Sequence, residues 1–389
     1  MLDPAKTIAA LEAKRDLFGD ALLKRQDHER LFDEALQVLR SLSLEEVDDR
    51  LSTIPSPGAH PTAEHDQYRD LIVPFGHSWS HHQDARDWGR SILKDVPTIA
   101  VDGSQIVPSI DLSIPVGVVQ IAWFENQHRE DSMYEKDLAI EVLAPAELSE
   151  DVAADEGMPD WKVNLRRFEM EAEKLVNYMK ERAGHEPKPV CFFDGSFIIS
   201  FVQHMRPGRQ RRYIDAVLEL INTSVKTRIP VVAYVDTSYA NDLVEMTGHI
   251  SSATYQGRVS DAGLLRRKMK WGERSQIMIC ARNDQVIEKY YDQVCFTYLK
   301  TTGENRPARI EFPRWIYESK QHSKMLDIVR AEVIVGNGYP YSLETADAAA
   351  VISMQDRERF FALFQKFAEQ QGYPLRFSRK ATSKRRRRV

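Results

Sequence analysis

The sequence predicts a mixed α/β fold with a central sheet flanked by helices. From residue 97 onward, short apolar runs rich in β-branched and aromatic residues recur, including TIAVDG, IPVGVVQIAWF, PVCFFDG, IPVVAYVD, SQIMICAR and QVCFTYLK. Helical patterns separate several of these runs, and strands that alternate with helices are typical of α/β domains. The composition agrees, since 42% of the 389 residues are hydrophobic and 29% are charged, as in ordinary soluble globular proteins.

The N-terminal part predicts a helical extension. Residues 5–40 carry apolar residues at helical spacing among many charged ones, which indicates one long amphipathic helix or a pair of them. The next segment, LSTIPSPGAHPTAEH, is rich in Pro, Ser and Gly and is expected to be a loop or linker. We therefore expect a helical extension with its linker over residues 1–90 and the main domain over residues 91–375.

Two apolar strands run into the same tripeptide, Asp-Gly-Ser, at Asp102 and at Asp194. Residues just past the carboxyl end of a strand face the crevice where α/β proteins bind ligands, and the glycine allows the chain to turn there. On neighbouring strands, the two carboxylates would lie close enough to share a divalent cation such as Mg²⁺ or Mn²⁺, which prefers oxygen ligands. The alternative is that each aspartate only caps its own turn.

A metal pair that cleaves phosphodiesters needs further carboxylates. The helix DWKVNLRRFEMEAEKLVNYMKERAG precedes Asp194, and Glu169 borders its apolar stripe, with Glu171 farther round the helix. Asp347 lies early in a helix that begins near Ser342, beside the apolar segment AAAVI. An acid in that place is either a partner of the helix dipole or a site residue that points into a cleft.

Basic residues gather in two places. The segment MRPGRQRRYID follows the second Asp-Gly-Ser, and its arginines are candidates for holding DNA phosphates, the alternative being a solvated helix start; they are Arg206, Arg209, Arg211 and Arg212. The C-terminal run RFSRKATSKRRRRV carries eight positive charges and no acid, so that the rest of a chain with net charge −5 stands at about −13. We expect residues 376–389 to form a disordered basic tail, either simply solvated or holding a polyanion.

Several classes are excluded or disfavoured by the sequence. No apolar run approaches the roughly 18 residues that a membrane-spanning helix needs. The three cysteines, at 191, 280 and 295, lie outside any CxxC spacing and within or beside apolar runs, which indicates a reducing, cytoplasmic setting without disulfides. The chain has no GxxxxGK[ST] motif and hence no ATP motor of its own, and GxSxG and GxGxxG are also absent.

Six segments in order resemble the NurA nuclease family over roughly residues 90–355: IAVDGSQ, RRFEMEAEKL, CFFDGSF, IPVVAYVDTS, ARIEFPRW and GYPYSLETADAAAVI. The resemblance implies an RNase H-like fold and DNA cleavage with Mn²⁺ or Mg²⁺. Carried over by motif, it implies catalytic and metal-binding roles for Asp102, Glu169 (with Glu171 as the alternate) and Asp194, and a catalytic role for Tyr339. Archaeal members have a histidine where this chain has Asp347, so Asp347 is either a substitute carboxylate ligand, which we favour, or not catalytic.

The resemblance also implies partners. Members form a homodimer around a DNA channel and work with HerA, a hexameric translocase ATPase. The N-terminal amphipathic segment is a candidate dimer or partner surface, the alternative being that it packs on its own body.

We therefore expect a metal-dependent deoxyribonuclease, a 5′–3′ exonuclease or single-strand endonuclease or both, in DNA end processing or DNA defence. The alternative is a non-catalytic DNA-binding clamp that stimulates a translocase. The sequence leaves open the polarity of cleavage, the preference for single or double strands, and the choice between repair and defence.

Overall fold

The computed structural model describes residues 2–109, 111–131, 133–149, 160–284, 286 and 289–376. The chain divides into two compact units. The first unit comprises Met1–Ser78, Val235–Asp284 and Lys289–Arg314, and the second comprises Trp79–Tyr234, Gln285–Glu288 and Trp315–Val389. Apart from residue 376, the basic tail lies outside the described residues. The domain limits at residues 90 and 375 remain predictions.

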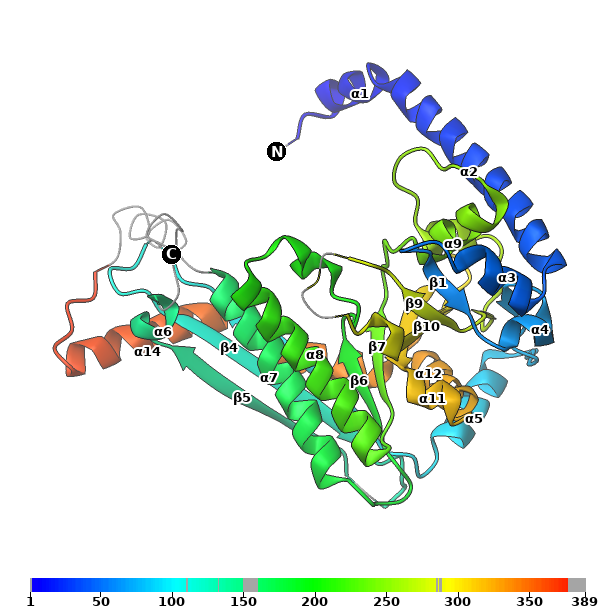
Figure 1. Ribbon diagram of the computed structural model, residues 1–389. Coiled ribbons are helices and arrows are strands. Elements are labelled where there is room, and N and C mark those ends of the chain that lie inside the picture. Colours follow the sequence, from blue (N-terminus) through cyan, green and yellow to red (C-terminus); the bar gives the residue numbers. More distant parts are fainter. Residues whose placement is uncertain are drawn as a thin grey trace. The chain divides into compact units, whose positions relative to one another are not determined.

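The second unit is built on a mixed sheet with the strand order β7-β6-β3-β4-β5 (Figure 1). Its strands are β3 (Thr98–Ile106), β4 (Gly117–Asn126), β5 (Glu135–Leu143), β6 (Val190–Asp194) and β7 (Val231–Val235). The first three form an antiparallel meander, whereas β6 is parallel to both β3 and β7. The expectation of a mixed α/β fold with a central sheet flanked by helices is confirmed, and its RNase H-like character remains a prediction.

Helices cover both faces of this sheet. α7 (Asp160–Glu181) and α8 (Pro207–Thr227) lie side by side (Figure 1). α7 packs on β3 and β4, and so does α13 (Tyr341–Ala350). Successive strand residues point to opposite faces, so Gly103 faces α7 while Asp102 reaches α13. The remaining helices of this unit are α5 (His82–Leu93), α6 (Pro145–Ser149), α11 (Arg314–Glu318), α12 (His322–Val335), α14 (Met354–Gln370) and the short 3₁₀ helix Ser200–His204.

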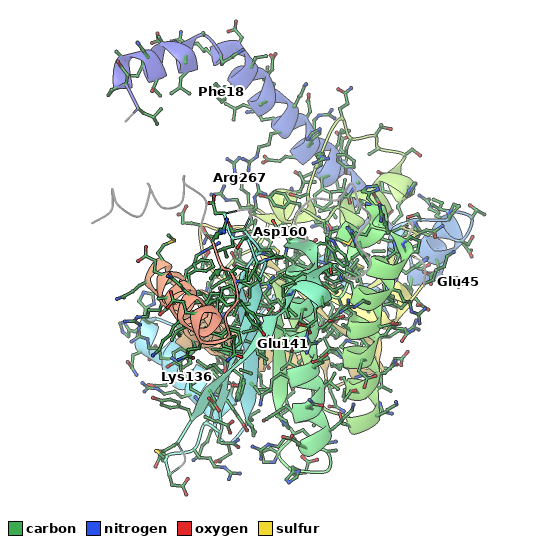
Figure 2. The ribbon with its side chains drawn as sticks, turned by 90° about the vertical axis from the view of Figure 1, so that its left-hand side faces the viewer. Phe18, Glu45, Lys136, Glu141, Asp160 and Arg267 are labelled. Carbon is green, nitrogen blue, oxygen red and sulfur yellow. The ribbon has the colours of Figure 1, made fainter. Side chains whose placement is uncertain are left out.

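The register of α7 on the sheet follows from its apolar stripe and a few polar anchors. Leu165, Leu175 and Met179 are fully buried, at the spacing that places residues on one helical face. Near its N-terminal end, Arg166 donates to both oxygens of Glu141 on β5 at 2.8 Å (Glu141 is labelled in Figure 2). These contacts fix the rotation of α7 on the sheet and therefore the direction in which Glu169 and Glu171, near the middle of the helix, point.

The first unit combines antiparallel strands with helices. Its ladder runs β1 (Gly58–Pro61), β9 (Met278–Ala281), β10 (Val294–Leu299) and β11 (Ala308–Pro313), with β2 (Ile72–Val73) and β8 (Arg274–Ser275) beside it. Its helices are α1 (Pro4–Glu12), α2 (Arg15–Ser41), α3 (Leu44–Leu51), α4 (Glu64–Tyr68), α9 (Asp242–Ser251), α10 (Asp261–Leu265) and the 3₁₀ turn Tyr291–Gln293. The expected N-terminal helices are confirmed.

The prediction of a loop or linker around residues 52–66 is wrong for Gly58–Pro61, which forms strand β1. β1 pairs with β9, with Gly58 opposite Ala281, because the backbone hydrogen bonds of a sheet edge can recruit even a Gly- and Pro-containing segment. Gly58 has φ +84°, and a Cβ there would lie 2.5 Å from the carbonyl oxygen of Asp242. The N-terminal residues are thus part of a unit completed by segments more than 150 positions later.

None of the described helices combines the length and hydropathy that crossing a bilayer requires.

A buried charge network holds the first unit together. Arg309, almost wholly inaccessible to solvent, donates to Asp242 at 2.5 Å and to Glu311 at 2.6 Å. Arg282 also pairs with Asp242, and the Arg309 and Arg282 guanidinium groups, acting against the cost of burial, keep the pKa of Asp242 below its usual value. Removal of one member of such a network destabilises the fold, because it leaves a buried charge without its partner.

We expect Arg309→Ala to lower the free energy of unfolding by about 3–5 kcal/mol, because it leaves Asp242 and Glu311 buried without their shared cation. Urea titration followed by circular dichroism measures this loss. Arg30→Ala, at an ion pair of which both side chains are more than half exposed, is the control and should leave the midpoint unchanged. Equal stability of the two variants would contradict a structural role for the network.

Candidate active site

Asp102 and Asp194 lie next to one another on adjacent parallel strands. Val101 of β3 is opposite Phe193 of β6, which brings the following residues, the two aspartates, side by side. Asp194 is the last residue of β6, and Gly195 continues the chain with φ +141°. The expected strand end is correct there but wrong at Asp102: β3 continues through Gly103 to Ile106, because β4 supplies hydrogen-bonding partners along its whole length.

The carboxyl of Asp102 is shielded and crowded by other acids. Only 9% of Asp102 is exposed, and it is hydrogen-bonded to Asp347, which α13 brings over the sheet. Burial, the bond to Asp347 and the charge of Asp194 together raise the pKa of Asp102 to about 7, against the opposing effect of the Gly103 backbone. Two interacting carboxyls share a proton or a cation, since both cannot be charged cheaply.

Glu171 is the helix-borne acid that joins this cluster. It is 4% exposed, and its Oε1 has no hydrogen-bond partner. Burial first, and then the charges of Asp102 and Asp194, raise the pKa of Glu171 to about 8, although the Arg167 guanidinium acts in the opposite direction. We define the acid cluster as Asp102, Glu171, Asp194 and Asp347.

Glu169, the acid preferred from the sequence, lies elsewhere. It accepts two hydrogen bonds from Arg212 of α8, each 2.7 Å long. Residues two apart on an α-helix point about 200° apart, so Glu169 and Glu171 cannot face the same group. The structure therefore favours the alternate, Glu171, over Glu169.

Tyr339 reaches the cluster from a turn between α12 and α13. Its hydroxyl lies 3.4 Å from Oδ1 of Asp194, and its ring packs edge-on against Tyr234, with centroids 5.1 Å apart. A Cβ on Gly336 would lie only 2.0 Å from the carbonyl oxygen of Tyr339, so a glycine there lets the turn close tightly enough to place the tyrosine. The structure thus brings Tyr339 together with the acid cluster.

The candidate DNA-binding arginines lie on the early turns of α8 or just before them. Arg212 pairs with Glu169, Arg211 with Asp215 at 2.8 Å, and the Arg209 guanidinium stacks 3.7 Å from the centre of the Trp161 ring. Arg206 directly precedes Pro207, the first residue of the helix. Their contact with a phosphate remains a prediction.

Arg167 is a candidate that the sequence reading missed. Its Nη1 donates to the carbonyl oxygen of Gly103 at 2.9 Å and lies 3.6 Å from Oε1 of Glu171. The signal was present, because Arg167 precedes Glu171 by four residues and such pairs share a helical face. Arg167 is the cation nearest to Glu171 among the described ion pairs.

The donor chemistry of the acid cluster fits a hard divalent cation. All the donors are carboxylate oxygens, the ligands that Mg²⁺ and Mn²⁺ take, and Glu171 Oε1 is buried without a hydrogen bond, although the Arg167 guanidinium lies 3.6 Å away. The carboxyls repel one another, which contributes to their raised pKa values, and a bound cation would relieve this repulsion. As they stand, no three His, Cys, Asp or Glu side chains in the described part of the chain are grouped closely enough to hold a metal ion, so binding would require these side chains to close in.

Gly103 is the residue on which this packing depends. A Cβ there would lie 2.5 Å from Glu171 Oε1 and 2.8 Å from Cγ of Arg167. We expect Gly103→Ala to fold but to cleave DNA about a hundredfold more slowly, because a displacement of an ångström at a reacting centre has effects of that size. Gly208→Ala, at a position with open space around it, is the control, and single-turnover cleavage rates compare the two. Equal rates would show that Gly103 does not position the site.

A NurA domain model matches residues 96–352 of this chain. No curated protein matches the sequence.

Several solved structures show distant similarity. The catalytic domain of human Endonuclease V is 11% identical, with a TM-score of 0.35, covering 80% of this chain and 96% of that one. Ciona intestinalis Endonuclease V in complex with inosine-containing DNA is 10% identical, with a TM-score of 0.30, covering 72% and 96%. Kluyveromyces polysporus Argonaute with a guide RNA is 11% identical, with a TM-score of 0.27, covering 67% of this chain and 27% of that one. Similarity at this level carries no conclusion about activity.

Proposed function

We propose, from the premise that this chain belongs to the NurA family, that it is a deoxyribonuclease that hydrolyses DNA phosphodiester bonds with Mn²⁺ or Mg²⁺. The family membership supports a nuclease in general. The observation that carries the more specific proposal is the acid cluster, in which two strand residues, one residue of α7 and one of α13 gather carboxyls around Asp102.

Asp102, Glu171, Asp194 and Asp347 would hold the ion or ions. A bound divalent cation would neutralise the carboxylates and stabilise the negative charge that develops on the phosphate in the transition state. Asp102 or Asp347, whose carboxyls interact and hold the pKa of Asp102 at about 7, would take up the proton that the water loses when it attacks phosphorus.

Two further side chains would orient the reactants. Tyr339, tethered to Asp194, can direct its hydroxyl toward the phosphate or the water. Arg167, held against the Gly103 carbonyl, carries a permanent positive charge beside the cluster and can stabilise a phosphate oxygen. Both roles are those of preorganised donors near the place where charge develops.

Cleavage of labelled linear and circular single-stranded DNA in Mn²⁺, Mg²⁺ or EDTA tests the proposal. Metal-dependent loss of the linear strand supports a nuclease, and loss of the circle shows that it can act without an end. A protein that binds both substrates and cuts neither, even with a HerA-type ATPase and ATP present, would be the non-catalytic clamp instead.

We also propose that the chain acts in the cytoplasm as a homodimer, with a HerA-type hexameric ATPase as its motor, in DNA end processing or defence. A feature that supports a protein partner is the exposed apolar side chains of the N-terminal helices, such as Leu11, Phe18 and Leu22, each more than half exposed (Phe18 is labelled in Figure 2). Light scattering of the protein alone tests the homodimer, and light scattering of its mixture with the ATPase tests the complex. A monomeric mass would refute the first, and no increase in mass on mixing would refute the second.

Metal binding should also be visible as stabilisation. We expect saturating Mn²⁺ to raise the melting temperature by about 3 °C and EDTA to reverse the rise, because an ion that binds only the folded state stabilises it by about 2.7 kcal/mol at a hundred times its dissociation constant. Differential scanning fluorimetry measures the shift. Mn²⁺ should have little effect on an Asp102→Asn, Asp194→Asn double variant, and an equal shift there would place the ion elsewhere.

A further inference from the structure

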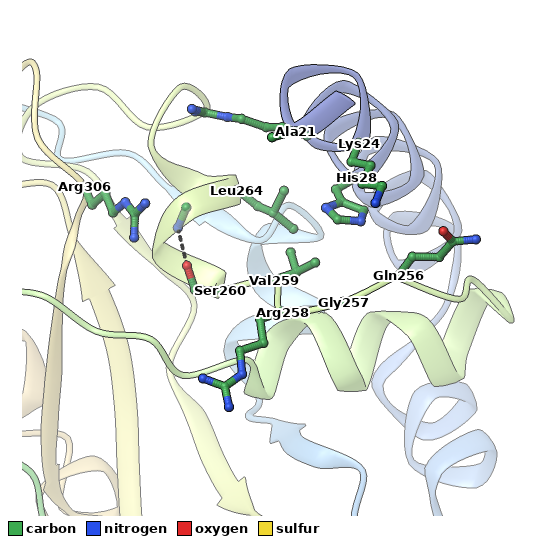
Figure 3. A pocket seen from close by; sticks show the side chains of 12 residues that line it. Ala21, Lys24, His28, Gln256, Gly257, Arg258, Val259, Ser260, Leu264 and Arg306 are labelled. Carbon is green, nitrogen blue, oxygen red and sulfur yellow. Dashed lines mark hydrogen bonds between the residues drawn. The ribbon is translucent and has the colours of Figure 1, made fainter. Parts of the chain in front are cut away.

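A cavity of about 600 Å³ in the first unit lies between α2 and the loop that follows α9 (Figure 3). Three separate segments contribute positively charged or basic side chains to its wall. α2 supplies Lys24, Arg25 and His28, the loop supplies Arg258, and the β10–β11 connection supplies Arg306. We call this site the basic pocket and define it by these five residues.

The charges of the basic pocket are almost uncompensated. Its described lining contains no Asp or Glu, and within the described part of the chain only Arg25 of the five has a carboxylate partner, Glu29 at 3.1 Å. Bringing like charges together from distant segments costs free energy, so the arrangement does not serve the stability of the fold. It is instead what an anionic ligand would require.

The pocket also has an apolar side. Val259, Leu264 and Ala21 line it beside the cations, and the ring of His28 adds aromatic surface to its wall. A volume of about 600 Å³ exceeds what a phosphate alone would fill and suits a nucleotide-sized group. Apolar and aromatic surface next to cations is how proteins bind single strands, whose bases are free to stack.

We propose that the basic pocket binds the backbone of single-stranded DNA and holds one nucleotide of the strand. Guanidinium groups match the geometry of phosphate oxygens, and the pocket concentrates positive charge on a chain whose net charge is −5. The choice of DNA rests on the proposed function, whereas the preference for an unpaired strand rests on the shape and lining of the pocket.

The test is binding of a fluorescent single strand of about 20 nucleotides to the full chain in EDTA, followed by anisotropy between about 50 and 200 mM salt. The pocket variant combines Lys24→Gln, Arg258→Gln and Arg306→Gln, all at exposed positions. The control variant makes the same change of charge at exposed positions of the same unit outside the pocket: Lys14→Gln, Arg30→Gln and Arg267→Gln (Arg267 is labelled in Figure 2).

We expect the pocket variant to lose affinity at least about tenfold and its salt slope to fall by about 2, because each lost phosphate contact removes about 0.7 from the slope for single strands. The control should lose less than about threefold, and both variants should melt at the wild-type temperature. Equal losses in the two variants, or an equal loss for a duplex of the same length, would overturn the proposal.

Binding in EDTA does not depend on cleavage. A chain that binds through the pocket but never cuts would therefore refute only the nuclease, and a chain that cuts but binds the strand equally well without the pocket would refute only the pocket.

Discussion

Replacement of Asp194 by asparagine is expected to lower the rate of DNA cleavage on the order of a thousandfold or more, with folding unchanged. Asparagine keeps the shape of the side chain and an acceptor for the Tyr339 hydroxyl, which lies 3.4 Å from Asp194, but it removes the charge that a metal ligand needs. Losses of this size are typical when a central catalytic group is removed. Single-turnover cleavage with Mn²⁺, with wild type and variant at equal concentration, measures the effect.

The matched control is Asp215→Asn, which removes a carboxylate from an exposed pair with Arg211 on α8 and should cleave at the wild-type rate. Asp102→Asn should behave like Asp194→Asn, because Asp102 lies beside Asp194 on the neighbouring strand. Cleavage by Asp194→Asn within about threefold of wild type would remove the central support for the proposed mechanism.

Exchange of Glu171 for glutamine should separate activity from stability. We expect cleavage to fall at least about a hundredfold, since the acid cluster loses a carboxylate. In EDTA, however, the variant should melt at a higher temperature than wild type, because Glu171 is buried, lacks a hydrogen bond at Oε1 and lies near two other acids. Opposite signs for activity and stability are the signature of a residue kept for function.

The pH dependence of the metal-free protein gives a second readout. The pKa of Glu171 rises from 4.5 to about 8 in the folded state, so above the lower value the folded state holds a proton that the unfolded state has released. Stability contributed by this group is therefore complete at low pH and falls as the pH rises toward about 8. Glu171→Gln should flatten that slope in urea titrations at several pH values.

Glu169→Gln is the matched control two residues away. The Glu169 side chain is 14% exposed and is paired through both oxygens with Arg212, so its loss should change the cleavage rate no more than a few fold and should lower, not raise, the melting temperature in EDTA. A large loss of activity in Glu169→Gln together with full activity in Glu171→Gln would reverse our assignment and restore the one preferred from the sequence.

Not every element could be predicted from the sequence. β5 was missed, because it is an edge strand that is largely exposed and has no continuous apolar run. β1 was read as a linker, because four residues that include Gly and Pro carry no strand pattern by themselves. Both are strands only because a neighbour, β4 or β9, offers its backbone hydrogen bonds.

The sequence by itself determined the α/β class, the family resemblance and the two strand-borne aspartates, because periodicity and short motifs are local properties of the chain. Only the tertiary structure decided which acid of α7 lies near them. The sequence pattern locates the edge of the apolar face of a helix only to within a residue or two, and the rotation of the helix on the sheet settles which side chain faces the aspartates. The tertiary structure alone showed Arg167 against Gly103, and it alone gathered Lys24, Arg258 and Arg306 into one pocket. Contacts between residues far apart in the chain depend on how segments pack, and no local pattern encodes that packing.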